Sequence, residues 1–220
     1  MLRWTIIAAL ALACATSRPK PEAAPVAERP PAPPPRAMPK PQLEVPVNDV
    51  VLAQLRKMTA TPGARRYLRG ALEHRKQQLA AVHAALDAQR LPPQLDAIPL
   101  VESGYENVDG GRNGAGLWQF VTATAVHFGL RVDARVDERM DPARETAAAA
   151  RYLRELHDEL GDWPLVLAAY SQGITHVRAV VRREKTRDVW ELIRRGALGP
   201  YAAKVMAAAL LIEDPGRAGV

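Results

Sequence analysis

From residue 48 onward, apolar side chains recur every three or four positions, which is the spacing of helices with one buried face. Asn48 or Asp49 can cap a first helix that runs to about Thr59, and Thr61-Pro62 opens a longer one. The predicted inward face of that longer helix consists of Leu68, Leu72, Leu79, Val82 and Leu86. No convincing alternation of apolar and polar residues predicts a strand. The pattern therefore predicts an all-α fold.

Capping residues mark the later helices. Thr122 starts a helix that stops at Gly129. Asp141-Pro142 starts a longer helix, which Gly161 closes, and Asp162 caps the next one. The inward positions of the helix after Asp141 are predicted to be Ala149, Leu153, Leu156 and Leu160. Amphipathic stretches at about 177–181, 189–193 and 201–212 complete the chain.

One short predicted helix ends in an acid. Leu95, Ile98 and Val101 recur at helical spacing after a proline pair, and Glu102 follows in the last turn. The negative end of the helix dipole and the apolar neighbours disfavour a charged carboxylate. We therefore expect the pKa of Glu102 to be raised toward a value useful for a general acid. The alternative is a solvated glutamate at a helix end.

Four short segments follow one another in a fixed order. They are ES at Glu102-Ser103, GAGLWQF at 114–120, TATA at 122–125 and AAYSQG at 168–173. In these segments the sequence resembles the lytic transglycosylases of the SLT, goose-lysozyme-like superfamily (glycoside hydrolase family 23). An ES dipeptide alone is uninformative, whereas four segments in order with compatible spacing are a strong signal. The resemblance implies a lysozyme-like helical (SLT) domain.

Further features make the chain most similar to the membrane-bound murein transglycosylase D group of that family. They are Trp118 in the second segment, VDERMDP at 136–142, Asp162-Trp163 before the AAY segment, and the tail PYAAKVMAAALLI at 200–212. The resemblance covers about residues 85 to 215.

The sequence departs from the family pattern in four places. Ser171 stands where the family usually has Asn, Thr122 stands for a usual Pro, and Gly110 stands for a Ser near the acid. The stretch between Ser103 and Gly114 is also about one residue short. None of these changes removes the proton donor, but together they bear on the contacts with glycan.

The resemblance implies a mechanism with a single carboxylate. Most glycosidases use two carboxylates, whereas in this family one glutamate protonates the leaving oxygen and then accepts the proton of the C6 hydroxyl of N-acetylmuramic acid. That hydroxyl attacks its own anomeric carbon, so the product is a 1,6-anhydro sugar. Glu102 is the expected acid/base. Four acids lie near it in sequence, and loop solvation is the expectation for each: Glu106, Asp109, Asp133 and Asp137.

The matching segments also imply residues that bind the substrate. Tyr170 is expected to approach the acid through its hydroxyl, or to be a buried tyrosine with a purely structural bond. Gln119 is expected to bond an N-acetyl sugar, and Ser103 either the substrate or the helix end. Ser171 is expected in the sugar-contacting turn. Trp118, with Phe120, either offers aromatic surface to a sugar or belongs to the core.

The N-terminus has the features of an exported lipoprotein. Arg3 precedes the apolar run 6–13, which is too short to span a bilayer and is typical of a signal peptide. Cys14 ends this run in ALAC, which resembles a bacterial lipobox, so we expect Cys14 to carry the lipid that attaches the protein to a membrane. An ordinary signal peptide with an incidental thiol is the alternative. Ala15 after the cysteine favours the outer membrane of a Gram-negative bacterium, with the protein facing the periplasm.

Composition and charge restrict the partners. The net charge of +6 is spread over mixed helix surfaces, and an exported chain rarely meets nucleic acid, so nucleic-acid binding is not expected. The five histidines show no metal-binding spacing, so neither a metal nor a cofactor is expected. The expected partner is the peptidoglycan glycan strand. The sequence points to no protein partner.

The chain divides into five predicted parts. They are a signal peptide (1–13), a lipidated, proline-rich linker (14–47), N-terminal helices (48–90), a catalytic SLT domain (91–185) and C-terminal helices packed on it (186–220). The linker would reach about 30 Å as a coil and roughly 100 Å when extended. Two alternatives to a transglycosylase stay open. One is a muramidase that uses water, and the other is a peptidoglycan-binding envelope protein with weakened catalysis.

Overall fold

The computed structural model describes residues 43–111 and 114–220, and helices dominate this part of the chain. The prediction of an all-α fold is confirmed. The predicted signal peptide, the lipidation site at Cys14 and nearly all of the linker lie outside the described residues. Within the described residues, no helix combines the length and apolar character needed to cross a membrane.

The first two helices begin at the predicted caps. Helix α1 (Asp49–Met58) starts after Asn48, whose side chain accepts the backbone N–H of Val51 at 2.9 Å. Helix α2 (Pro62–Ala88) starts after Thr61, whose hydroxyl accepts the N–H of Ala64 at 3.1 Å. Each cap satisfies a backbone donor that has no partner within the helix. Of the predicted inward face of α2, three residues are buried and two are half-buried: Leu68, Val82 and Leu86, then Leu72 and Leu79.

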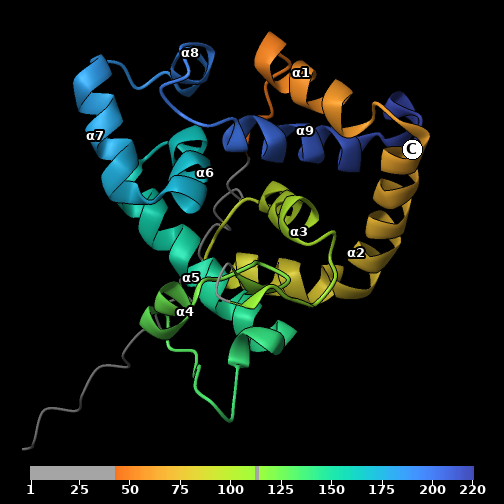
Figure 1. The fold of residues 1–220 in the computed structure, drawn as a ribbon, viewed down its shortest axis with the longest axis vertical. Coiled ribbons are helices and arrows are strands. Elements are labelled where there is room, and N and C mark those ends of the chain that lie inside the picture. The colour runs from red at the N-terminus through yellow and green to blue at the C-terminus, as the bar shows by residue number, and fades with distance from the viewer. Residues whose placement is uncertain (1–42, 112–113) are drawn as a thin grey trace, which may run out of the picture. The chain divides into compact units, whose positions relative to one another are not determined.

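The acid-bearing segment folds as a 3-10 helix followed by a short α-helix. Helix η1 (Pro93–Asp96) continues into α3 (Ala97–Glu102), which lies between α9 and α2 in the middle of Figure 1. Leu95, Ile98 and Leu100 are buried, so this segment runs through the core and ends with its acid at the edge of the core. The prediction that Glu102 lies in the last helical turn is confirmed.

A small hairpin that the sequence did not predict follows α3. Strand β1 (Val108–Asp109) pairs antiparallel with β2 (Ala115–Gly116), with Val108 opposite Gly116. Each strand has only two residues, which is too short for alternation to be visible in the sequence.

Helix α5 (Pro142–Leu160) is the longest described helix after α2, and it packs on both α2 and α6 (Trp163–Gln172). It follows α4 (Thr122–His127) and the 3-10 helix η3 (Glu138–Met140) in the chain. Gly161 ends α5 in the left-handed conformation with φ 65°, as the sequence predicts. All four predicted inward positions of α5 are buried: Ala149, Leu153, Leu156 and Leu160.

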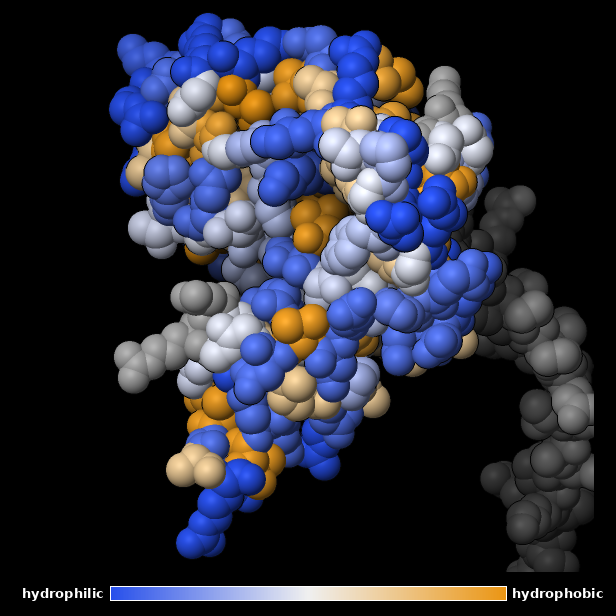
Figure 2. All heavy atoms as spheres, turned by 45° about the vertical axis from the view of Figure 1, so that its right-hand side comes forward, coloured by the Kyte–Doolittle hydropathy of each residue, from blue (hydrophilic) through white to orange (hydrophobic). Residues whose placement is uncertain are grey.

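The last helices close the core. Helices α7 (Ile174–Glu184) and α8 (Val189–Arg194) precede α9 (Tyr201–Glu213), and the 3-10 helix η4 (Pro215–Ala218) follows. Nine of the 13 residues of α9 are buried, because α1, α3 and α6 all pack on it. Five of these nine are alanines, whose small side chains let the neighbouring helices approach closely. In the view of Figure 2, hydrophilic side chains cover most of the surface and hydrophobic residues form separated patches.

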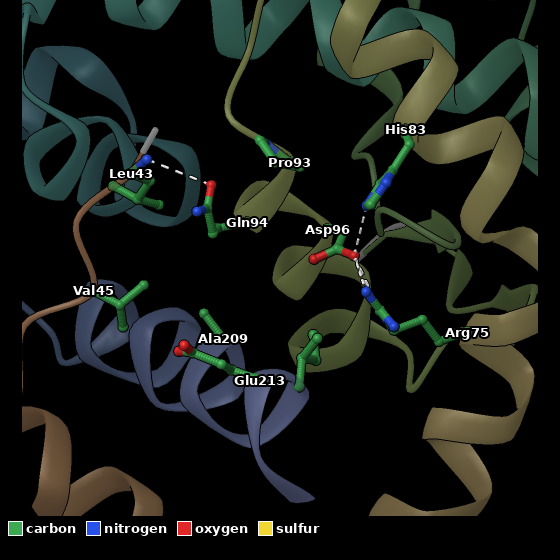
Figure 3. Close-up of a pocket in the computed structure, with 10 residues that line it drawn as sticks. Leu43, Val45, Arg75, His83, Pro93, Gln94, Asp96, Ala209 and Glu213 are labelled. Atoms are coloured by element: carbon green, nitrogen blue, oxygen red, sulfur yellow. Dashed lines mark hydrogen bonds and ion pairs between the residues drawn. The ribbon is translucent and has the colours of Figure 1, made fainter. Parts of the chain in front are cut away.

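A buried ion cluster fixes the start of α3 on α2. The carboxylate of Asp96 accepts the Arg75 Nε at 3.0 Å and Nη2 at 2.5 Å, and it lies 3.0 Å from His83 Nε2 (Figure 3). The Tyr105 hydroxyl donates to the backbone oxygen of Asp96 at 2.6 Å. The Asp96 side chain is only 3% exposed, so these partners replace its water. The cluster borders a hollow of about 510 Å³.

We predict that Asp96→Ala lowers the free energy of unfolding by about 3–5 kcal/mol, because it leaves the guanidinium of Arg75 in a buried place without a counter-charge. Urea unfolding of the variant and the parent chain measures this loss. The exposed pair of Lys76 and Glu73 is the control, and Glu73→Ala is expected to cost less than about 1 kcal/mol. Equal, small losses in both variants would contradict the prediction.

Candidate functional site

Glu102 opens onto a cavity of about 180 Å³. Its walls come from five segments: the end of α3, the turn after β2, the start of α4, helix α5 and the end of α6. Its lining residues are Glu102, Gln119, Phe120, Val121, Thr124, Tyr152, Tyr170 and Ser171. The fold thus gathers the ES, GAGLWQF, TATA and AAYSQG segments around one hollow.

The environment of Glu102 favours its neutral form. Burial raises the pKa of Glu102, while a hydrogen bond from Tyr201 and the nearby charge of Lys204 oppose the rise. The Tyr201 hydroxyl donates to Glu102 Oε1. The rise in the pKa of Glu102 has the direction expected from the sequence, and its largest cause is desolvation by the surrounding core.

Tyr201, and not Tyr170, forms the bond to the acid. The Tyr170 hydroxyl donates instead to the backbone oxygen of Trp118 at 2.7 Å, so of the two expectations for Tyr170 the structure provides the structural bond. The rings of Tyr170 and Tyr201 stack with their centroids 6.1 Å apart at an interplanar angle of 15°. Tyr170 therefore packs against the ring of Tyr201, and its hydroxyl binds the turn that contains Trp118.

Two further aromatic rings complete this wall. Tyr152 lies 5.5 Å from Tyr170 and 5.9 Å from Phe120, measured between ring centroids. Burial raises the pKa of Tyr170 and of Tyr201, and the negative charge of Glu102 raises both further. Both tyrosines are therefore protonated hydrogen-bond donors at neutral pH.

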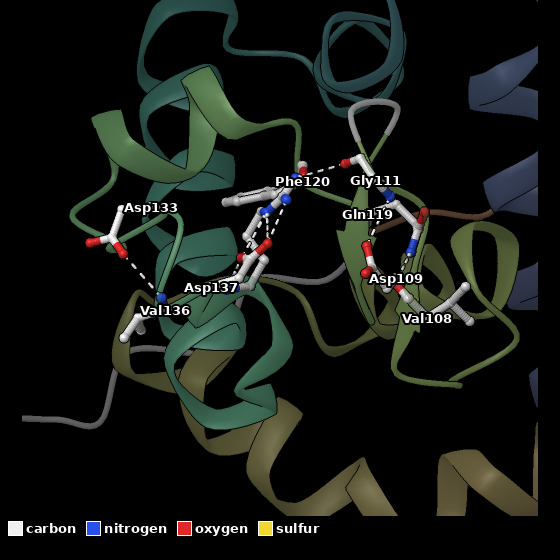
Figure 4. A network of polar contacts seen from close by, with 9 residues as sticks. Val108, Asp109, Gly111, Gln119, Phe120, Asp133, Val136 and Asp137 are labelled. Carbon is white, nitrogen blue, oxygen red and sulfur yellow. Dashed lines mark hydrogen bonds and ion pairs between the residues drawn. The ribbon is translucent and has the colours of Figure 1, made fainter.

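Gln119 lies at the junction of the hairpin and the cavity. Its Nε2 donates to the backbone oxygen of Gly116 at 2.8 Å. It also donates to the backbone oxygen of Val108 at 3.2 Å, as Figure 4 shows. The residue adopts a left-handed backbone with φ 53°, which turns its side chain back over the hairpin. These bonds fix the amide nitrogen within the protein and place the residue on the cavity wall.

Ser103 has a structural environment. Its hydroxyl donates to Leu117 O at 2.9 Å and lies 3.3 Å from Pro99 O, and the residue is buried. Of the two expectations for Ser103, the structure therefore provides the bond to the helix end, together with a link to the next motif. Ser171 is exposed and lines the cavity.

Trp118 does not offer a ring to the cavity. It is fully buried, and its Nε1 donates to Thr146 Oγ1 at 3.0 Å. The prediction of direct sugar contact by Trp118 is therefore wrong in this structure, because core side chains cover its ring. Phe120 is also almost completely buried but reaches the cavity wall.

Sequence reasoning missed a buried acid, Glu145. Its Oε2 accepts the N–H of Leu117 at 2.7 Å and its Oε1 accepts the N–H of Trp118 at 3.1 Å. Burial raises the pKa of Glu145 to about 8, against the opposing effects of these N–H donors and of Arg139. The sequence around ARETAAA does not identify Glu145 as buried, because a glutamate in such a segment looks the same as one on an exposed helix face.

The contacts of Glu145 extend to the acid at the cavity. The two residues it holds also accept side-chain bonds through their carbonyl groups, Leu117 from Ser103 and Trp118 from Tyr170. Ser103 directly follows Glu102 in the chain. The buried carboxylate thus fixes the turn to which both the end of α3 and the aromatic wall are bonded.

Glycines make this turn possible. A Cβ on Gly116, which has φ 86°, would collide with the carboxylate of Glu145 and with Arg139 O. A Cβ on Gly110 would collide with Gly114 O, so this backbone leaves no room for the serine that the family pattern has there. This backbone therefore requires glycine at position 110.

The other acids near Glu102 in sequence point elsewhere. Glu106 lies 3.6 Å from His74 Nδ1, and Asp109 accepts the N–H of Gly111 at 2.9 Å. Asp133 bonds the backbone of its own loop, and Asp137 pairs with Arg139 (Figure 4). Among the residues that the structure describes, Glu102 is the one carboxylate that lines the cavity. Within residues 43–111 and 114–220, no three metal-ligating side chains cluster closely enough to hold an ion.

The chain belongs to the Transglycosylase SLT domain family, which matches residues 79–193. This is a family of lytic transglycosylases, which are enzymes. The match covers the acid-bearing helix, the hairpin and all helices from α4 to α8.

Two curated relatives carry the name of a lytic transglycosylase. Membrane-bound lytic murein transglycosylase D of Escherichia coli (strain K12) is 26% identical over 185 residues, which cover 81% of this chain and 40% of that protein. The protein of the same name from strain O6:H1 is equally similar. The chain thus spans less than half the length of these relatives. The X-ray structure of an inactive mutant of lytic transglycosylase Slt from Pseudomonas aeruginosa is 24% identical, with a TM-score of 0.49, over 63% of this chain and 24% of that one.

We predict that Glu145 makes the stability of the protein depend on pH. Because its pKa is raised from 4.5 to about 8, the folded chain holds a proton in this range that the unfolded chain has released. This contribution to stability therefore falls as the pH rises from 4.5 to 8. Glu145→Gln stays neutral throughout, so its free energy of unfolding should decline less over this range.

Urea unfolding at pH 5 and pH 8 measures the difference for the parent chain and for Glu145→Gln. The exposed Glu73→Gln is the control, and its difference between the two pH values should match that of the parent. Parallel declines for the parent and Glu145→Gln would contradict the prediction.

Proposed function

We propose that this protein is a peptidoglycan lytic transglycosylase that cleaves the MurNAc-β-1,4-GlcNAc bond with Glu102 as its acid and base. The observation that carries the proposal is the position of Glu102. It is half-buried, its pKa is raised, and it is the carboxylate of the cavity around which the family's motifs meet. A raised pKa makes the protonated form of a carboxyl group more populated, and this form can act as a general acid.

The reaction has two stages at this one carboxyl group. Protonated Glu102 donates its proton to the glycosidic oxygen as the bond from the anomeric carbon to that oxygen breaks. The carboxylate then accepts the proton of the C6 hydroxyl while O6 forms a bond to the anomeric carbon. Glu102 is protonated again at the end, and no water is consumed. The intramolecular nucleophile removes the need for a second carboxylate to activate water.

The residues around Glu102 have supporting roles in this proposal. Tyr201 donates to the carboxylate after it has released its proton, and so stabilises the charged stage. Gln119 and Ser171 contact the sugars from the cavity wall. Ser103 and Tyr170 position the site from behind, through the turn that contains Trp118.

We also propose that the protein works in the envelope of a Gram-negative bacterium. A lipid on Cys14 would anchor it in the outer membrane, and the proline-rich segment before residue 48 would let the domain reach peptidoglycan. The E. coli relatives are named as membrane-bound lytic murein transglycosylases, which supports this location.

We predict that the purified chain releases anhydro-muropeptides from peptidoglycan sacculi. Attack by the C6 hydroxyl gives products that are lighter by one water and have no reducing end, so borohydride leaves their mass unchanged. Glu102→Gln keeps the shape but has no transferable proton, and acid-base catalysis contributes ~10²–10⁴-fold, so release by this variant should be undetectable. Mass spectrometry before and after reduction reads out both results.

The other outcomes separate the alternatives. Reducible products from the parent chain would identify a muramidase that uses water. Sedimentation of the chain with sacculi without any release would identify a binding protein. Undiminished release by Glu102→Gln would exclude Glu102 as the catalyst.

We further predict that Tyr201→Phe shifts the pH dependence of cleavage. The hydrogen bond from Tyr201 lowers the pKa of Glu102, so its removal should raise this pKa further. Because the acid must be protonated, kcat/KM falls as the pH rises through the pKa of Glu102, and in the variant this fall should move to higher pH. Tyr152→Phe is the matched control, because Tyr152 also lines the cavity but its hydroxyl has no bond to Glu102 among the described residues. A fall at unchanged pH in Tyr201→Phe would contradict the assignment.

A further inference from the structure

The last turn of α3 contributes to two hollows. Glu102 lines the cavity described above, whereas its neighbours Leu100 and Val101 line a second pocket of about 320 Å³. The end of α1, the start of α2 and the start of α9 provide the other walls. Two residues that line the second pocket thus directly precede Glu102 in the chain.

The floor of this second pocket is apolar and its rim is basic. Met58, Leu68, Leu100 and Val101 provide the apolar surface. Lys57 and Lys204 are exposed and line the same pocket from α1 and α9. No acidic residue lines it among the described residues. The pocket thus offers two ammonium groups above an aliphatic surface.

Neither lysine is neutralised by an ion pair. By comparison, Lys76 forms an ion pair with Glu73 at 2.7 Å. In the part of the chain that the structure describes, no carboxylate lies within ion-pair distance of Lys57 or Lys204. Lys204 nevertheless acts on the active site, since its charge lowers the pKa of Glu102. A ligand with carboxylates would supply the missing counter-charge.

An exposed tyrosine joins this pocket to the loop after Glu102. Tyr67 lines the pocket and is 54% exposed, which is unusual for a large aromatic side chain. Its hydroxyl lies against Gly104, where a Cβ would collide with it, so the glycine at φ 62° makes this approach possible. Tyr67 therefore contacts the backbone at Gly104, two positions after Glu102 in the chain, and its exposed ring borders the pocket.

We propose that this pocket binds the acidic peptide attached to the muramyl sugar of the strand cleaved at Glu102. The inference rests on the proposed function and extends it to the peptide portion of the substrate. The N-acetylated sugars of the glycan are uncharged, so the carboxylates of its peptides are the groups that Lys57 and Lys204 recognise. The aliphatic side chains of the same peptide match the apolar floor. The enzyme would thereby prefer peptide-bearing strands over bare ones.

Binding tests this inference independently of catalysis. The Glu102→Gln chain would be titrated by calorimetry with a GlcNAc-MurNAc disaccharide that carries its peptide, and with a bare disaccharide. The bare one is freed of peptide by an amidase, and its exposed lactyl carboxylate is then converted to a methylamide so that it carries no charge. The peptide-bearing disaccharide should bind more tightly. Adding Lys57→Glu should weaken its binding about three- to tenfold, because it replaces attraction by repulsion at a partly exposed site. Binding of the bare disaccharide should stay within about twofold.

Kinetics on whole strands gives the second readout. In the active chain, Lys57→Glu should raise KM for peptide-bearing strands by a similar factor and lower kcat much less. It should have little effect on strands that are freed of peptide and then amidated at the lactyl carboxylates. The difference should shrink at high salt, which screens exposed charges. Lys204→Gln should reduce the same preference and also shift the pH profile on both substrates, since Lys204 acts on Glu102.

Lys185→Glu is the matched control, because it makes the same change of charge at an exposed lysine that does not line the pocket. Equal binding of the two disaccharides by the Glu102→Gln chain, or an equal loss for both in Lys57→Glu, would overturn the inference. A loss in Lys185→Glu as large as in Lys57→Glu would also overturn it, because the effect would then be one of net charge. Failure to cleave either kind of strand would refute the proposed function instead, and the calorimetry would still decide the peptide site.

Discussion

The carboxyl group of Glu145 holds the turn on which the rest of the site depends. It is fully buried and accepts two consecutive backbone N–H groups, at Leu117 and Trp118, that would otherwise be buried without partners. Because the carbonyl groups of the same two residues accept bonds from Ser103 and Tyr170, one acid positions the end of α3 and the aromatic wall together. Gly116 is required because any side chain there would occupy the place of this carboxyl group.

The protonation of Glu102 reflects a balance between two opposing effects. Desolvation by the core raises its pKa, and the Tyr201 hydroxyl and the Lys204 ammonium limit the rise. Both limiting groups lie in the first turn of α9, a helix against which α1, α3 and α6 pack. The burial of α9 therefore fixes not only the core but also the electrostatics of the acid, although Glu102 and Tyr201 are 99 positions apart in the chain.

The two hollows at the end of α3 differ in chemistry. The cavity at Glu102 is lined by aromatic rings and by amide and hydroxyl groups, which suit uncharged sugars. The second pocket combines an apolar floor with two lysines, which suit a charged ligand. Since Lys204 borders this pocket and also acts on Glu102, a ligand that neutralises Lys204 would bear on the acid itself. If the pocket binds the peptide as proposed, substrate recognition and acid strength are coupled through this one side chain.

The sequence alone determined the helices from α1 to α9, their caps at Asn48, Thr61 and Asp141, and the place of Glu102 in a last helical turn. These features depend on spacing and capping among neighbours in the chain, which a sequence displays directly. The tertiary structure decided which tyrosine reaches the acid and that Glu145 lies beneath the turn. It also decided that Trp118 is core and that two-residue strands pair, because all of these depend on contacts between distant segments that leave no local pattern.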